Sequence, residues 1–256
     1  MAMPLLNKSY LATLAAVFFF PLTVQAAEIA FIDPADLLAD TLPSPVDAQA
    51  AFERLSLLPA PDLTKIKGQR IALEIDLKNS PGFSFETLGN RQEARYRMAF
   101  NNIAEGWSWQ PLADPQQEDY YRAKFLPLKS VQVERGAYDY QDKIGETQRM
   151  QVTWRYDYFL AFDNLYDFYP RSVDDDAGFV AALPLALPEH AASEVRMLAV
   201  ARLSDPLLSE STTFWKATHG QPTDFTLKKR YLHAQLEMIL FADGKDGRIL
   251  GRMARR

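Results

Sequence analysis

The sequence predicts an α+β fold with a mostly antiparallel sheet of about five to seven strands and a few packed helices, after a cleaved signal peptide. Three observations indicate this class. Stretches with apolar residues at every second position outnumber those with helical spacing, and the two kinds do not alternate regularly along the chain. Of the 256 residues, 48% are hydrophobic and 24% charged, which is ordinary usage for a globular protein.

The first 26 residues have the pattern of an export signal. A charged head is followed by an apolar run, a proline and small residues, namely Lys8, Leu11–Phe20, Pro21 and Val24–Ala26. The apolar run is shorter than the roughly 20 residues that a membrane-spanning helix needs. We therefore expect cleavage between Ala26 and Ala27, a periplasmic or secreted protein, and no transmembrane helix in the mature chain.

Residues 27–68 form a lead rich in proline and alanine, in which we expect short helices. The best of these runs from Val46 to Leu57, where Val46, Ala50 and Leu57 share one face. We expect residues 69–256 to form a single α+β domain.

The first predicted strand covers Arg70 to Leu77, where apolar and polar residues alternate, and a turn at 79–82 ends it. A helix is predicted from Arg91 to Glu105, because Tyr96, Phe100 and Ile103 recur at spacings of four and three. A shorter helix is predicted from Pro115 to Lys124.

The strongest pattern runs from Thr147 to Phe162, with a large apolar residue at nearly every second position. Ser130–Tyr140 is also strand-like, and Gly136 marks a possible bulge in it. Gln141–Glu146 has the composition of the turn that would join the two strands into an antiparallel hairpin.

The last third of the chain predicts a short helix at Pro188–Ser193 and a strand at Glu194–Leu203. That strand is apolar on both faces, which is typical of a central position. Residues 214–217 and the region of Pro222 look irregular. Tyr231–Phe241 alternates, and the turn at 243–247 leads into Arg248–Met253 as a terminal hairpin.

Recognisable catalytic chemistry is sparse. The chain has no cysteine and three histidines, His190, His219 and His233, at no spacing that would place two of them on one helix turn. His233 is expected at the surface. The acidic groups Asp174–Asp176 and Asp243 with Asp246 are better explained as solvated turns than as calcium ligands. We therefore expect no cofactor and no metal.

A pair of carboxylates could still serve polymer hydrolysis if the fold brought them together. The candidates lie on the polar faces of predicted strands: Glu74, Asp76, Asp157 and Glu237. Nothing in the sequence indicates that they converge.

Aromatic residues give the best candidates for partner binding, because Trp and Tyr supply rigid contact area. We expect core packing for Trp154, Tyr156 and Tyr158. The candidate partner-binding residues are Trp107, Trp109, Tyr166 and Tyr169. The basic run 228–230 and the C-terminal arginines could touch anionic polymers, although such runs are usually solvated.

The net charge of −5 disfavours nucleic-acid binding. Taken together, these observations predict an exported, non-enzymatic protein that binds another cell-envelope component, with an envelope protein as its partner. Two alternatives stay open: a hydrolase that uses acidic residues on an envelope polymer, and a small-ligand carrier with a pocket between helix and sheet.

Overall fold

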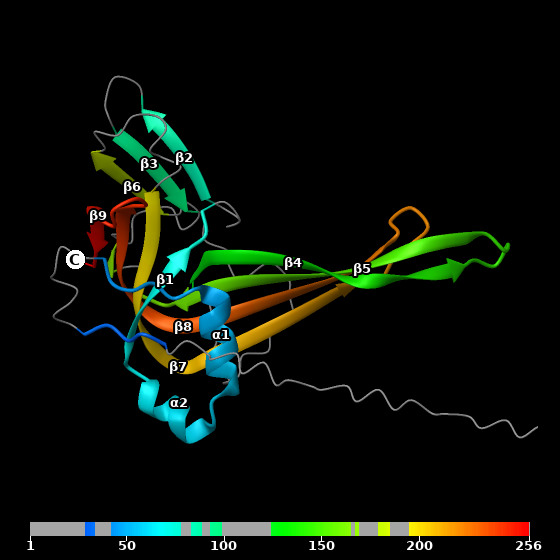
Figure 1. Ribbon diagram of the computed structural model, residues 1–256, viewed down its shortest axis with the longest axis horizontal. Helices are drawn as coiled ribbons and strands as arrows, with labels where there is room; N and C mark the ends of the chain where they lie inside the picture. The colour runs from blue at the N-terminus through cyan, green and yellow to red at the C-terminus, as the bar shows by residue number, and fades with distance from the viewer. Residues whose placement is uncertain are drawn as a thin grey trace, which may run out of the picture.

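The computed structural model describes most of the chain, and Figure 1 shows the arrangement of its elements. The described residues are 29–33, 42–77, 83–88, 93–98, 124–164, 167–168, 179–184 and 195–255, of which 83–88, 93–98, 124 and 179–184 are described by their backbone alone. Within these ranges no helix has the length and apolar character needed to cross a membrane.

A six-stranded mixed sheet forms the body of the protein (Figure 1). Its strands are β1 (Arg70–Ile75), β4 (Lys124–Gln141), β5 (Thr147–Phe162), β7 (Val195–Trp215), β8 (Thr223–Asp243) and β9 (Ile249–Ala254). The order is β1-β7-β8-β5-β4, and β9 also pairs with β8. The α+β class is confirmed. The sheet is mixed, however, because β5 and β8 run parallel while the other four pairings are antiparallel.

A second sheet contains β2 (Phe83–Leu88), β3 (Glu93–Met98) and β6 (Phe179–Pro184) in the order β2-β3-β6, with antiparallel pairing. The helix predicted from Arg91 to Glu105 is therefore wrong over β3. Within that strand Ala94, Tyr96 and Met98 also occupy every second position. Helical and strand spacing coincide over so short a stretch, and pairing with two neighbouring strands decides between them.

Two short helices precede β1: α1 (Ala48–Leu57) and α2 (Ala60–Ile66). The Asp47 side chain caps α1 by accepting a bond from the Ala50 N–H, 3.1 Å away. Ala51, Phe52 and Leu55 are buried against the sheet, so α1 covers the main core. The helix expected over Val46–Leu57 is confirmed, and it begins two residues later than predicted, at Ala48.

The sheet curls at the end that carries α1, which we call the base. There the amide of Asp76, just after β1, donates to the Leu128 carbonyl of β4 at 2.7 Å, so the two outer strands meet. The largest buried cluster lies inside this curl and includes Leu73, Leu160, Leu232 and Phe241.

Beyond the base, β4, β5, β8 and β7 continue together as a projecting arm (Figure 1). We define the arm as residues 130–157 and 210–230. The 21 residues of β8 span about 70 Å at roughly 3.3 Å per residue, so this strand runs through both base and arm. None of the buried members of the three hydrophobic clusters lies in the arm.

The far halves of β7 and β8 depart from expectation. The strand predicted to end at Leu203 continues to Trp215 after an irregularity at 204–207, and β8 begins at Thr223 rather than Tyr231. Residues 214 and 215 are thus strand and not irregular. In the outer halves of β7 and β8, residues 210–215 and 223–230, the only buried side chains are the polar Asp224 and Thr226, so these stretches lack the apolar alternation that marks a half-buried strand.

Candidate functional site

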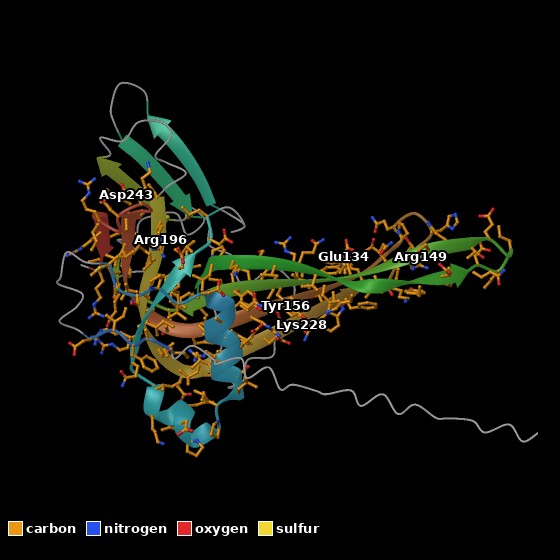
Figure 2. The ribbon with its side chains drawn as sticks, in the orientation of Figure 1. Glu134, Arg149, Tyr156, Arg196, Lys228 and Asp243 are labelled. Carbon is orange, nitrogen blue, oxygen red and sulfur yellow. The ribbon has the colours of Figure 1, made fainter. Side chains whose placement is uncertain are left out.

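The arm carries a basic and aromatic face on the same side of the sheet as α1. In the parallel register Tyr156 lies opposite Lys228, and Tyr158 lies opposite Arg230. Figure 2 shows Tyr156 and Lys228 beside each other, between α1 and the far end of the arm. Alternation along each strand brings these residues to one face.

Cations cover the rings of this face. The Arg230 guanidinium lies 4.6 Å from the centre of the Tyr156 ring. Arg135 and Lys228 lie 4.9 and 5.5 Å from the centre of the Trp154 ring. Such contacts are attractive, each on the order of 0.5–2 kcal/mol. The expected core role of the strand aromatics holds for the buried Tyr158, whereas Trp154 and Tyr156 are half-buried beneath cations.

Glu210 of β7 holds two of these cations in place. Its carboxylate accepts from Lys228 Nζ at 2.9 Å and from Arg230 Nε at 2.7 Å. Burial disfavours ionisation of Glu210, but the hydrogen bonds from both cations outweigh it and hold its pKa below the ordinary value. The basic run 228–230 was interpreted from the sequence as a solvated segment. In the structure, two of its three cations, Lys228 and Arg230, pair with Glu210 across the sheet.

A second cluster of polar side chains links the strands in the outer part of the arm. Asp224 accepts from the Ala217 amide at 2.6 Å, from Lys216 Nζ at 2.8 Å and from the Tyr138 hydroxyl at 2.9 Å. The backbone bond from Ala217 and the bond from Lys216 lower the pKa of Asp224. One carboxylate thus joins β4, β8 and the segment between β7 and β8.

Large apolar side chains are exposed along the arm, two near the β4–β5 turn and two at the end of β7. Six large hydrophobic residues are exposed among the described residues, and four of them lie in the arm: Tyr140, Ile144, Phe214 and Trp215. Phe214 and Trp215 are consecutive on β7 and so face opposite sides of the sheet. Folding of the base does not require any of these four side chains, since each lies outside the buried clusters.

Both outer edges of the arm are open. β4 is the last strand of the sheet, and β1 pairs only with residues 197–202 of β7. Within the described part of the chain, residues 210–215 of β7 and 130–141 of β4 therefore have a neighbouring strand on one side only. Unpaired backbone groups along such an edge can pair with an added strand.

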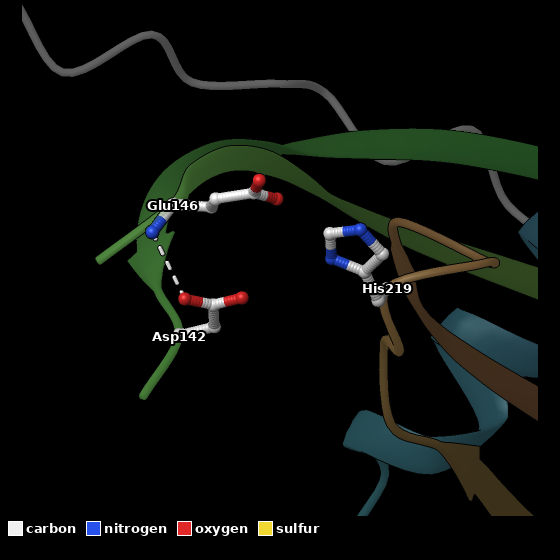
Figure 3. Close-up of side chains that lie close together, drawn as sticks. All are labelled: Asp142, Glu146 and His219. Carbon is white, nitrogen blue, oxygen red and sulfur yellow. Dashed lines mark hydrogen bonds between the residues drawn. The ribbon is translucent and has the colours of Figure 1, made fainter. Parts of the chain in front are cut away.

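Two loops meet at the end of the arm and bring three potential ligands together (Figure 3). Asp142 and Glu146 belong to the β4–β5 turn, and His219 belongs to the segment between β7 and β8. One ligand atom from each lies within 4.8 Å of the others. His219 and the carboxylates are far apart in the sequence, so the spacing rules applied to the sequence could not find this group.

A cavity of about 650 Å³ lies between the two helices and β7. Phe52, Leu55, Leu63 and Leu208 supply much of its apolar lining, and Lys67 and Glu210 are among its charged residues. The volume falls within the range of small-ligand pockets, roughly 300–1,000 Å³. The alternative of a pocket between helix and sheet thus has a defined location.

Three of the four carboxylates considered for hydrolysis are paired with arginines. Glu74 pairs with Arg196, and Asp157 pairs with Arg155. Glu237 binds Arg70 at 2.7 Å and Arg202 at 2.6 Å. Burial opposes ionisation of Glu237, but the two guanidinium groups outweigh it and lower its pKa, opposite to the shift that a general acid needs.

The histidine expected at the surface of β8 is instead mostly covered. Burial lowers the pKa of His233 to about 4, and its Nε2 lies 2.6 Å from the Ser209 hydroxyl. The turn acids Asp243 and Asp246 accept amide bonds from Lys245 and Arg248, as expected for an ordinary turn.

The residues predicted for partner binding and for signal cleavage lie outside the described residues. These are Trp107, Trp109, Tyr166, Tyr169, Ala26 and Ala27. The same applies to Pro188–Ser193, to Asp174–Asp176 and to most of the helix predicted over 115–124. The exposed Phe214 and Trp215 were not among the residues predicted from the sequence. The sequence feature that could have identified them is a pair of adjacent aromatic residues after a polar stretch of strand, where core packing does not require aromatic side chains.

Comparison of the chain with protein-family models, with curated proteins and with solved structures finds no match in any of the three.

Proposed function

We propose that this chain is an exported, non-enzymatic binding protein whose arm docks onto another protein of the cell envelope. The observation that carries the proposal is that, among the described residues, four of the six large exposed apolar side chains lie on the arm, outside the buried clusters. Aromatic side chains contribute much of the binding energy at protein interfaces, so an arm that exposes three of them is suited to contact with a partner.

The construction of the arm supports this function. The ion pairs of Glu210 and the bonds of Asp224 hold its strands in register, so that the end is presented on a stiff support. A preorganised surface loses less conformational entropy on binding. The open edges of β4 and β7 also allow a partner strand to add by backbone pairing.

Export is proposed from the N-terminal pattern alone. Cleavage after Ala26 would leave a mature chain starting at Ala27. Intact mass of the protein recovered from the envelope fraction tests this step separately, and a chain retaining residues 1–26 would contradict it.

Photo-crosslinking in living cells tests the docking surface. A benzophenone side chain placed at Ile144, which is 81% exposed at the arm, is compared with one placed at Leu57, which is 83% exposed at the base. The two positions are equally accessible apolar sites, so random collisions label both alike. We expect a discrete adduct of one mass from position 144 and none from position 57. Equal adducts from both positions, or none from position 144, would refute docking through the arm.

A second candidate function, small-ligand carriage, rests on the cavity between α1, α2 and β7. Anilinonaphthalene sulfonate, an apolar anionic dye, is a suitable probe because Lys67 lies among the lining residues. Ala60→Trp would obstruct the cavity from an exposed position on α2 and leave the core intact. Saturable 1:1 dye binding that Ala60→Trp abolishes would favour carriage, and binding unchanged by the substitution would exclude this cavity.

A further inference from the structure

Three side chains at the end of the arm have the chemistry of a divalent metal site. They are Asp142, Glu146 and His219, whose ligand atoms all lie within 4.8 Å of one another (Figure 3). Two carboxylate oxygens and an imidazole nitrogen form a mixed donor set, which suits zinc and neighbouring first-row divalent ions. Calcium takes six to eight oxygen ligands and fits this set poorly.

The local backbone fixes where these side chains can reach. Asp142 uses Oδ1 to accept the amides of Ile144 and Glu146, each at 2.9 Å, which leaves Oδ2 for another ligand. Across from this turn, Thr218 and Gln221 exchange backbone hydrogen bonds and close the loop that carries His219.

An independent observation comes from Gln148, which connects the two loops. Its Nε2 donates to the His219 carbonyl at 3.3 Å, so the Gln148 amide lies against the loop that carries the imidazole. Its Oε1 is buried and lacks a hydrogen-bond partner, the single such side-chain atom among the described residues. A buried polar atom without a partner is costly in free energy, and a bound ion or water beside it is one arrangement that would remove this cost.

We infer that Asp142, Glu146 and His219 bind one zinc-like divalent ion, which clasps the β4–β5 turn to the loop between β7 and β8. Ligand atoms around a tetrahedral zinc lie about 3.4 Å apart for bonds near 2.1 Å. The observed separations, at most 4.8 Å, need to shrink by up to about 1.4 Å, which side-chain rotation with a small movement of the two loops can supply. Three protein ligands leave at least one coordination position for water or for another molecule.

This inference goes beyond the proposed docking function and does not depend on it, because metal binding is measured on the protein alone. The test is titration of the tag-free mature chain with zinc at pH 7.5, in competition with a chromophoric chelator. We expect one saturable site per chain. His219→Ala, Asp142→Asn and Glu146→Gln should each weaken it at least tenfold, and Asp142→Asn keeps an oxygen that can hold the turn.

Asp139→Asn is the matched control, since Asp139 is an exposed carboxylate near the same end and pairs with Arg149. Its zinc affinity should equal that of the wild type. Absence of a saturable site, wild-type affinity in His219→Ala, or an equal loss in Asp139→Asn would overturn the inference.

Discussion

Glu237 is the position where loss of one side chain should most clearly weaken the base. It accepts from Arg70 Nε at 2.7 Å, from Arg202 Nε at 2.9 Å and from Arg202 Nη2 at 2.6 Å. These bonds join β8 to β1 and β7 across the sheet. Replacement by alanine leaves both guanidinium groups without this partner in a partly buried place.

The magnitude follows from the exposure of the partners. A hydrogen bond to a charged group contributes roughly 1.5–3 kcal/mol when it is well buried. The Arg202 side chain is 43% exposed and the Arg70 side chain 20%, so water can replace part of the hydrogen bonding that the two guanidinium groups lose. We expect Glu237→Ala to lower the free energy of unfolding by about 2–3 kcal/mol. For a chain of this length that corresponds to a fall in Tm of roughly 4–12 °C.

The stability that Glu237 contributes should depend on pH and should be lost on acidification. The folded-state pKa of Glu237 lies below the ordinary value of 4.5. Its contribution is therefore complete above about pH 4.5 and is lost as the pH falls through the lower, folded-state pKa. The gap between wild type and Glu237→Ala should be full at pH 7 and close on acidification.

Urea unfolding followed by circular dichroism at pH 7 and at pH 3 measures the loss of unfolding free energy in Glu237→Ala and how this loss depends on pH. Glu74→Gln is the control, because Glu74 and Arg196 form a more exposed pair whose loss should cost under about 1 kcal/mol. The reasoning would be refuted if the unfolding free energies of wild type and Glu237→Ala differed by less than about 0.5 kcal/mol at pH 7, or if their difference were the same at pH 3 as at pH 7.

Two further predictions concern the core and a covered histidine. Leu55 is fully buried where α1 meets the sheet, so Leu55→Ala should lower the unfolding free energy by about 2.5–4 kcal/mol in urea titrations, and a loss under 1 kcal/mol would mean that α1 is not packed there. Burial lowers the pKa of His233 to about 4, so its imidazole should titrate near pH 4 by NMR, not near 6.5. Its contribution to stability is complete above pH 6.5 and is lost as the pH falls toward 4, a slope that His233→Gln should reduce.

The sequence pattern located the elements that border the core. β5 spans Thr147–Phe162, the range that alternation indicated, and α1 and β1 differ from their predicted ranges by two residues at one end. The irregularity expected at Gly136 is present as a register shift between Glu134 and Gly136. Each of these elements lies against the buried core for part of its length, which is the condition under which periodicity carries information.

The elements that were missed lie where that condition fails. The outer halves of β7 and β8 bury no apolar side chain, so residues 214 and 215 looked irregular and 228–230 looked like a simple charge run. The parallel pairing of β5 with β8 was also missed, because alternation along a strand does not record the direction of its neighbour.

The candidate site was mostly beyond the reach of the sequence for the same reason. Phe214 and Trp215 stand out only once the arm is known to lie outside the core. The group of Asp142, Glu146 and His219 depends on two turns that meet at the end of strands paired in parallel. Local spacing cannot report a meeting of residues so distant in the chain.

The central claim is that the arm, and not the base, binds a partner. The most direct measurement is the native mass of the protein in gently extracted envelope fractions, for the wild type, for a Phe214→Ser/Trp215→Ser double variant and for Leu57→Ser. The account predicts that wild type and Leu57→Ser migrate in one complex of defined mass, and that the double variant migrates as the free chain. Co-migration of all three would contradict it.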